Sequence, residues 1–143
     1  MHRPITPESS RMQREIRDFR GTRRSVVLAT VDGQGLPDAS YAPCLDDAQG
    51  NVYIFVSALA PHTRNLLADA RVSVLFIEDE GETANVFARR RLTLECSATP
   101  IAREHPDWVG VLDGMTARLG ELMGTLRHLA DFQLFRLTPR CAT

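Results

Sequence analysis

The sequence predicts a mainly β (α+β) domain, a small antiparallel β-barrel or sheet braced by helices. Six short segments rich in β-branched and aromatic residues are separated by turn residues, which is typical of strands. Three of them follow one another without an intervening helix, so an antiparallel meander is favoured over a parallel, doubly wound sheet. One long stretch with apolar residues at helical spacing supplies the main helix. The 143 residues are expected to form a single domain, 1–143.

The N-terminal region is expected to contain a loose arm and a first helix. Residues 1–8 carry two prolines and are expected to form the arm. A capping-box pattern at Ser10 predicts the start of the helix, which should end near Gly21. Three apolar residues then share one face of this helix: Met12, Ile16 and Phe19.

The meander follows directly. Strands are predicted at 25–31, 39–45 and 51–57. Asp-Gly and Gly-x-Pro patterns within 32–37, and the polar stretch 46–50, predict the two connecting turns.

The second half alternates helices with single strands. Pro61 stands where a first-turn proline belongs and predicts a short helix over 61–69. The remaining elements are expected in chain order as a strand at 71–77, a helical turn at 84–88, a strand at 90–98, the longest helix at 106–130 and a last strand at 132–137.

Composition restricts the chemistry. All 17 basic residues are arginines, so roles that need an amine able to lose its proton, such as a Schiff-base lysine, are excluded. Arginine stays charged and binds anions with a planar fork of donors. A net charge of −1 with 6% aromatic residues argues against a nucleic-acid partner.

The chain carries no targeting or membrane signal that we recognise. No apolar run approaches the roughly 18 residues that span a bilayer, and the polar N-terminus lacks a secretory core. The three cysteines, Cys44, Cys96 and Cys141, are odd in number and far apart, which favours a reducing compartment. We therefore expect a cytoplasmic protein with no membrane partner.

Two segments could bind an anion. The first is Pro61 to Asn65 at a helix N-terminus, where Thr63 and Arg64 could add a hydroxyl and a guanidinium to free backbone N–H groups. An ordinary helix start with a solvated Arg64 explains the same residues and is favoured by local sequence alone. His62 lies in this segment, but no two histidines have a metal-ligand spacing, so no protein-only metal site is expected.

The second segment is the run of three arginines at 89–91, which enters the fifth predicted strand. Alternation sends Arg89 and Arg91 to one face and Arg90 to the other. Phosphate binding and internal pairing with the acidic residues at 78–82 explain the run equally well.

Taken together, an ordered series of motifs resembles the pyridoxamine-phosphate-oxidase-like flavin-binding split barrels, and within them the haem-utilisation subfamily. The motifs span about residues 13 to 139: LATVD at 28–32 with Gly35 and Pro37, SYAP at 40–43, SALAPHTRNL at 57–66, VSV at 72–74, IEDE at 77–80, FARRRLT at 87–93 and DFQLFRL at 131–137.

This resemblance implies a six-stranded antiparallel split β-barrel that forms a homodimer, with FMN in a cleft between the subunits. The residues that it places near FMN are Ser40, Tyr41 and Ala42 beside the flavin, Ser57, His62, Thr63 and Arg64 near the phosphate and ribityl chain, and Arg91 reaching in from strand five. The expected function is that of an FMN-dependent oxidoreductase with a small-molecule ligand.

Two departures from the family bear on this expectation. Strand two lacks the Arg and Lys of true pyridoxamine-phosphate oxidases, so oxidation of that vitamer is not expected. The haem-utilisation subfamily usually continues into a tail that can supply a haem-ligating histidine, whereas this sequence ends at Thr143. The subfamily's positions His62 and Asp131 are retained, so the alternative expectation is a haem-binding protein of iron acquisition.

Overall fold

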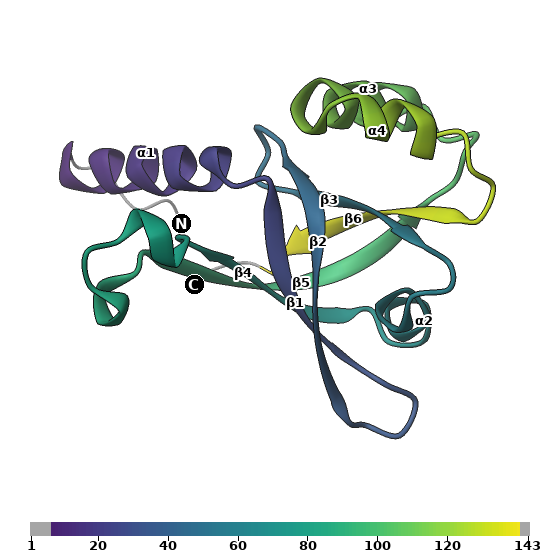
Figure 1. Ribbon diagram of the computed structural model, residues 1–143, viewed down its shortest axis with the longest axis horizontal. Coiled ribbons are helices and arrows are strands. Elements are labelled where there is room, and N and C mark those ends of the chain that lie inside the picture. The colour runs from purple at the N-terminus through teal and green to yellow at the C-terminus, as the bar shows by residue number, and fades with distance from the viewer. Residues whose placement is uncertain (1–6, 141–143) are drawn as a thin grey trace, which may run out of the picture.

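The computed structural model describes residues 7–140, and its six strands form one closed antiparallel barrel in the order β1-β2-β3-β6-β5-β4. This architecture confirms the predicted six-stranded antiparallel barrel with flanking helices (Figure 1). The strands are β1 (Ser25–Val31), β2 (Pro37–Asp46), β3 (Val52–Ser57), β4 (Arg71–Ile77), β5 (Arg91–Ile101) and β6 (Phe132–Pro139). The helices are α1 (Pro7–Thr22), α2 (Pro61–Ala68), α3 (Trp108–Leu119) and α4 (Glu121–Leu126), with short 3₁₀ turns η1 (Glu80–Glu82) and η2 (Val86–Ala88).

The meander is held in register by two turns of similar chemistry. In the first, the Asp32 carboxylate accepts hydrogen bonds from the backbone N–H groups of Gln34 and Leu36, at 2.8 and 2.9 Å. In the second, Asp47 accepts from Gln49 and Asn51 in the same way. These aspartates satisfy backbone donors that no strand partner reaches, as expected of Asx-type turns.

Two apolar clusters form the core. The first fills the barrel with inward-facing residues of every strand, including the fully buried Leu28, Val74 and Phe135. The second lies outside the barrel, where α3 and α4 cover the outer surface of β3 and β6 (Figure 1). Tyr53 and Phe55 of β3 face this second cluster, so β3 is buried on both faces.

The predicted long helix over 106–130 is instead two helices. Gly120 separates α3 from α4 with φ 98° and ψ −169°, a conformation that only glycine adopts without strain. The helical spacing of apolar residues continues through the break, which is why the sequence pattern did not reveal it. Arg127 then joins α4 to α3, since its guanidinium lies 2.8 Å from the Asp113 carboxylate.

The first helix is longer than expected and less buried. It begins at Pro7, so part of the expected arm 1–8 is helical, while residues 1–6 lie outside the described residues. Proline is well tolerated in the first helical turn. Of the three residues expected on its apolar face, only Phe19 is buried, whereas Met12 and Ile16 are exposed because α1 projects from one end of the barrel (Figure 1).

No helix within residues 7–140 is both long enough and apolar enough to cross a membrane.

Candidate functional site

Helix α2 closes one end of the barrel and is fixed there by polar side chains that point inward. Asn65 is buried and donates through Nδ2 to the Thr30 hydroxyl and the Asp38 carboxylate, at 3.0 and 3.1 Å. Thr63 is also buried, and its hydroxyl donates to the Ser57 carbonyl at 2.5 Å. Leu66 packs into the barrel core beneath them. These side chains along the inner face of α2 therefore anchor the helix to the barrel.

The structure brings two of the expected site residues into contact here. The Nδ1 atom of His62 lies 2.9 Å from the hydroxyl oxygen of Ser40, which faces inward from β2. Burial lowers the pKa of the His62 imidazole below its usual value, and the Asp38 carboxylate opposes part of this shift. The neutral form of the ring therefore predominates at pH 7. Among the described residues its hydrogen bonding is confined to Nδ1, so Nε2 remains available to a ligand.

Asp131 reaches the same end of the barrel from the other side of the 57–61 segment. Its backbone carbonyl accepts a hydrogen bond from Ala58 at 2.6 Å, and the next residue, Phe132, pairs with Ser57 in the sheet. The Asp131 side chain is exposed. His62 and Asp131, which are 69 positions apart in the sequence, thus flank one segment at the surface.

Three of the side chains expected to contact a cofactor are used inside the fold instead. Ala42 is 1% exposed and packs in the barrel core, because β2 alternates and sends Tyr41 outward and Ala42 inward. The Thr63 hydroxyl is committed to the Ser57 carbonyl, as described above. The Ser57 hydroxyl in turn accepts from the backbone N–H of Leu59.

The three consecutive arginines divide between internal pairing and exposure. Arg90 forms an ion pair with the buried Glu78 at 2.8 Å, and the Arg89 guanidinium donates to the Glu78 carbonyl at 2.7 Å. Arg90 holds the pKa of Glu78 below its usual value, chiefly through that side-chain hydrogen bond. The Arg91 guanidinium has one hydrogen bond within the described part of the chain, to the carbonyl of Arg89 at 3.3 Å. Internal pairing thus accounts for two of the three arginines and leaves Arg91 as an exposed cation.

Arg91 does not lie near Ser40 and His62. It begins β5, which stands three strands from β2 in either direction around the barrel. Arg64 is also exposed, with one weak contact of 3.5 Å to the Leu59 carbonyl. The expected anion-binding arginines are therefore on separate sides of the molecule.

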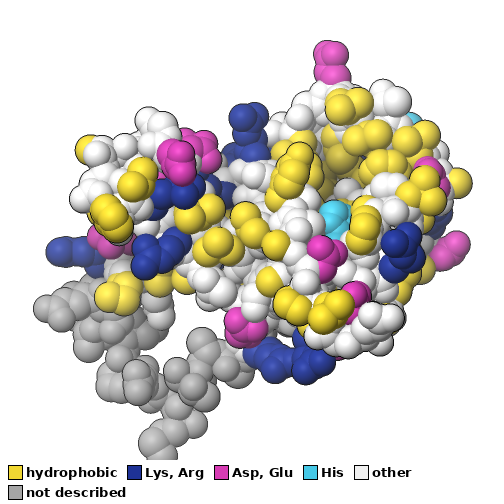
Figure 2. All heavy atoms as spheres, turned by 60° about the horizontal axis from the view of Figure 1, so that its bottom comes forward, with side chains coloured by type: hydrophobic (Ala, Val, Ile, Leu, Met, Phe, Trp, Pro, Cys, Tyr) yellow, Lys and Arg dark blue, Asp and Glu magenta, His cyan; other side chains and the backbone are white. Residues whose placement is uncertain are grey.

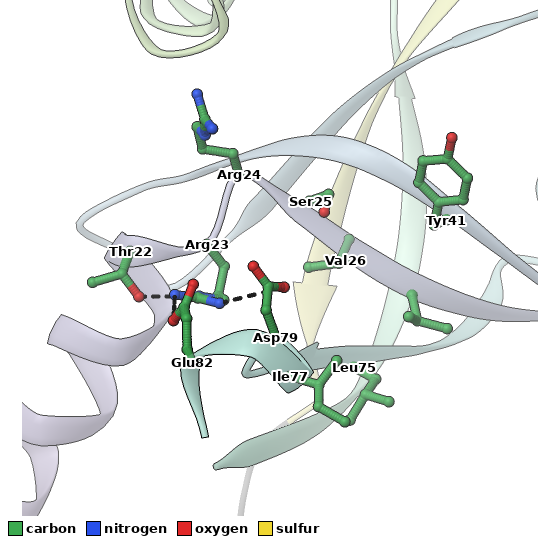
Figure 3. Close-up of a pocket in the computed structure, with 11 residues that line it drawn as sticks. Thr22, Arg23, Arg24, Ser25, Val26, Tyr41, Leu75, Ile77, Asp79 and Glu82 are labelled. Carbon is green, nitrogen blue, oxygen red and sulfur yellow. Dashed lines mark hydrogen bonds and ion pairs between the residues drawn. The ribbon is translucent and has the colours of Figure 1, made fainter. Parts of the chain in front are cut away.

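A cavity of about 530 Å³ lies on the outer surface of β1 and β4, beside the end of α1. Figure 3 shows Arg23 across one wall, donating to Thr22 and Glu82 and facing Asp79, while Arg24 points away from this group. Of the expected site residues, only Tyr41 lines it.

The floor of this cavity belongs to a larger uncovered surface, the outer face of β1, β2 and β4. We define this open sheet face by Val27, Ala29, Tyr41, Leu75 and Ile77. Val27 is 37% exposed and Tyr41 72% exposed, and register places Val27 opposite both Tyr41 and Leu75. A row of apolar side chains thus crosses three strands at the surface.

Sequence reasoning missed the inner polar group formed by Thr30, Asp38 and Asn65. One signal was present: alternation from Ser40 places Asp38 on the same inward face of β2. A carboxylate in that register needs a buried partner, and Asn65 supplies it.

Comparisons with known proteins show the same fold and a consistent set of relatives. The haem oxygenase HutZ of Vibrio cholerae is 43% identical over 129 residues, which cover 90% of this chain and 73% of HutZ. Its crystal structure, described as that of a haem storage protein, matches with a TM-score of 0.84 at 42% identity over 91% of each chain. Campylobacter jejuni ChuZ matches with a TM-score of 0.84 at 28% identity, over 92% of this chain and 54% of ChuZ.

These relatives correct the main functional expectation. An FMN-dependent oxidoreductase is the wrong interpretation, because the relatives at 42–43% identity are named for haem rather than for flavin. A structure of a haem-binding protein from Mycobacterium smegmatis agrees with this correction. It matches with a TM-score of 0.71 at 26% identity, over 88% of this chain and 50% of that one. The haem alternative fits the comparisons better.

The resemblance to the haem-utilisation branch is therefore confirmed. The family description "Pyridoxamine 5'-phosphate oxidase" matches residues 12–142, nearly the whole sequence. This chain belongs to the pyridoxamine 5'-phosphate oxidase family.

Proposed function

We propose that this protein binds haem and serves in haem utilisation. The observation that carries the proposal is the 43% identity, over 90% of the chain, to a protein named as a haem oxygenase. The α2 end of the barrel provides groups that suit haem. His62 offers a neutral imidazole with a free Nε2, a common axial ligand for haem iron. Arg64 offers an exposed guanidinium for a haem carboxylate.

The surface around these groups is mixed in character. Seen from the end that carries α2 and the β1–β2 hairpin, patches of hydrophobic side chains alternate with charges of both signs (Figure 2). Haem combines an apolar ring with two carboxylates, so such a surface can contact both parts of the molecule. Haem supplies the iron chemistry when it is bound, while the protein supplies orientation and exclusion of water.

The proposal includes a homodimer. Ser40 and Arg91 stand on opposite strands of one barrel, so a ligand site that uses both requires a second copy of the chain. The open sheet face is the surface on which we place that copy, since apolar side chains cross it without cover.

Haem titration tests the proposal. We expect the purified protein to take up haem with a Soret band, and His62→Ala to weaken binding about tenfold or more, equivalent to about 1.4 kcal/mol. His128→Ala, which removes an exposed histidine of the region after α4, is the matched control and should bind as the wild type does. A protein that fails to take up haem would contradict the proposal, and unchanged binding by His62→Ala would remove His62 as a ligand.

A further inference from the structure

Among residues 7–140, the His62 ring has one hydrogen-bond partner, Ser40 of β2, which contacts Nδ1. Its Nδ1 atom lies 2.9 Å from the Ser40 hydroxyl oxygen, while helix α2 itself is anchored separately by Thr63 and Asn65. Loss of the Ser40 hydroxyl would therefore leave α2 in place. It would remove only the hydrogen-bond partner of the His62 Nδ1 atom.

A contact between a serine hydroxyl and a neutral imidazole has two forms. In one, Ser40 donates to Nδ1, so the ring proton sits on Nε2 and that atom cannot donate an electron pair to a metal. In the other, Nδ1–H donates to the Ser40 oxygen and leaves a lone pair on Nε2. The position of the proton decides whether His62 can act as a ligand.

Asp38 favours the second form. It lies two residues before Ser40 on the same inward face of β2, and its carboxylate acts electrostatically on the His62 ring. A negative charge attracts the N–H end of the neutral ring and disfavours the lone-pair end. The nitrogen that faces β2 is Nδ1, so that is where the proton is stabilised.

We propose that Ser40 is a positioning residue: it accepts a hydrogen bond from Nδ1–H of His62 and so presents an unprotonated Nε2 to haem iron. The ligand part of this inference rests on the proposed function. Its tautomer part concerns the protein without haem. Histidines that bind metals generally donate their second ring nitrogen to a fixed acceptor, and loss of that acceptor costs roughly ten- to a hundredfold in metal affinity.

Nitrogen NMR of the haem-free protein tests the tautomer directly. With ¹⁵N-labelled histidine at mildly alkaline pH, we expect His62 to show the pattern of a ring protonated on Nδ1. Ser40→Ala should shift it toward the Nε2–H form that free histidine prefers in water, whereas Ser40→Thr keeps a hydroxyl and should restore the wild-type pattern. Ser97→Ala removes an exposed strand hydroxyl on β5 and is the control. A wild-type ring protonated on Nε2, or a pattern unchanged in Ser40→Ala, would overturn the inference.

Haem titration of the same variants separates this inference from the proposed function. If His62→Ala weakens haem binding, Ser40→Ala should weaken it by roughly tenfold and alter the Soret spectrum, with rescue by Ser40→Thr. Full binding by Ser40→Ala in that case would refute the positioning role while the haem function stands. If His62→Ala binds normally, the ligand assignment fails, and only the NMR result bears on Ser40.

Discussion

At the scale of single residues, arginine serves two different purposes in this lysine-free chain. Arg20, Arg90 and Arg136 are tied to carboxylates at 2.5–2.8 Å, and each also lies over an aromatic ring, at 5.0–5.5 Å from its centre. The planar guanidinium makes both contacts at once, which an ammonium group does less well. Arg64 and Arg91, in contrast, have no carboxylate partner in the described region. These two arginines are therefore left for a ligand.

The pair formed by Asp69 and Arg71 predicts a change of stability in acid. Arg71 donates to both carboxylate oxygens, at 3.0 and 2.7 Å, and this lowers the pKa of Asp69 from 3.8 to about 2. A carboxylate with a lower pKa in the folded state stabilises the fold above pH 3.8, and this contribution is lost as the pH falls toward 2.

Asp69→Asn should therefore be modestly less stable than the wild type at pH 6, and the difference should disappear near pH 2. Urea denaturation across this range measures it. Asp18→Asn, which removes an exposed carboxylate without an ion pair in the described part of the chain, is the control and should not reproduce the pH dependence. A difference between Asp69→Asn and the wild type that persists at pH 2 would show that packing, rather than charge, is responsible.

At the scale of elements, the sequence predicted strands better than helix ends. Strands β1 and β4 have the predicted bounds, because alternation and flanking turns mark both ends. Strand β5 extends to Ile101, beyond the predicted Ala98, because β6 pairs with its last residues. That pairing is formed between distant segments, and no local pattern reports it. Likewise, the family resemblance named Ser40 and His62 as site residues, but only the closed barrel brings them into contact.

Gly120 supplies a prediction at this scale. Its φ of 98° and ψ of −169° place the α3–α4 junction in a region that residues with a Cβ rarely adopt. Gly120→Ala should lower the free energy of unfolding by about 1–3 kcal/mol. Chemical denaturation monitored by circular dichroism measures this effect.

The matched control lies within α3, the helix that Gly120 ends. Gly110 has regular helical geometry, and no heavy atom lies within 4 Å of where a Cβ would stand. Gly110→Ala should leave stability unchanged or raise it by up to about 1 kcal/mol, since alanine favours helix. If Gly120→Ala left the free energy of unfolding unchanged, the junction would tolerate a Cβ and the break would have another cause.

At the scale of the whole molecule, the helices cover the barrel unevenly. The second apolar cluster buries the outer side of β3 and β6 beneath α3 and α4, whereas no element within residues 7–140 forms such a layer over the open sheet face. A two-fold interface is self-complementary, so one patch serves both subunits. Stable interfaces bury about 800 Å² on each partner, and the open sheet face with its neighbouring cavity offers a continuous surface for such contact.

A charge placed in the centre of this face should therefore separate the proposed dimer. Val27 pairs with Tyr41 on one side and Leu75 on the other, so Val27→Asp would bury one carboxylate from each subunit in the proposed interface, without partners. We expect light scattering after size exclusion to give the mass of a monomer for this variant and of a dimer for the wild type.

Leu122→Asp is the matched control, because Leu122 is 68% exposed on α4, away from the open sheet face, and it should leave the dimer intact. A dimer that survives Val27→Asp but is lost in Leu122→Asp would place the interface on the α3–α4 side, and a wild-type monomer would remove the proposed dimer. If the dimer carries the haem site, Val27→Asp should also weaken haem binding, although His62 and Ser40 are untouched.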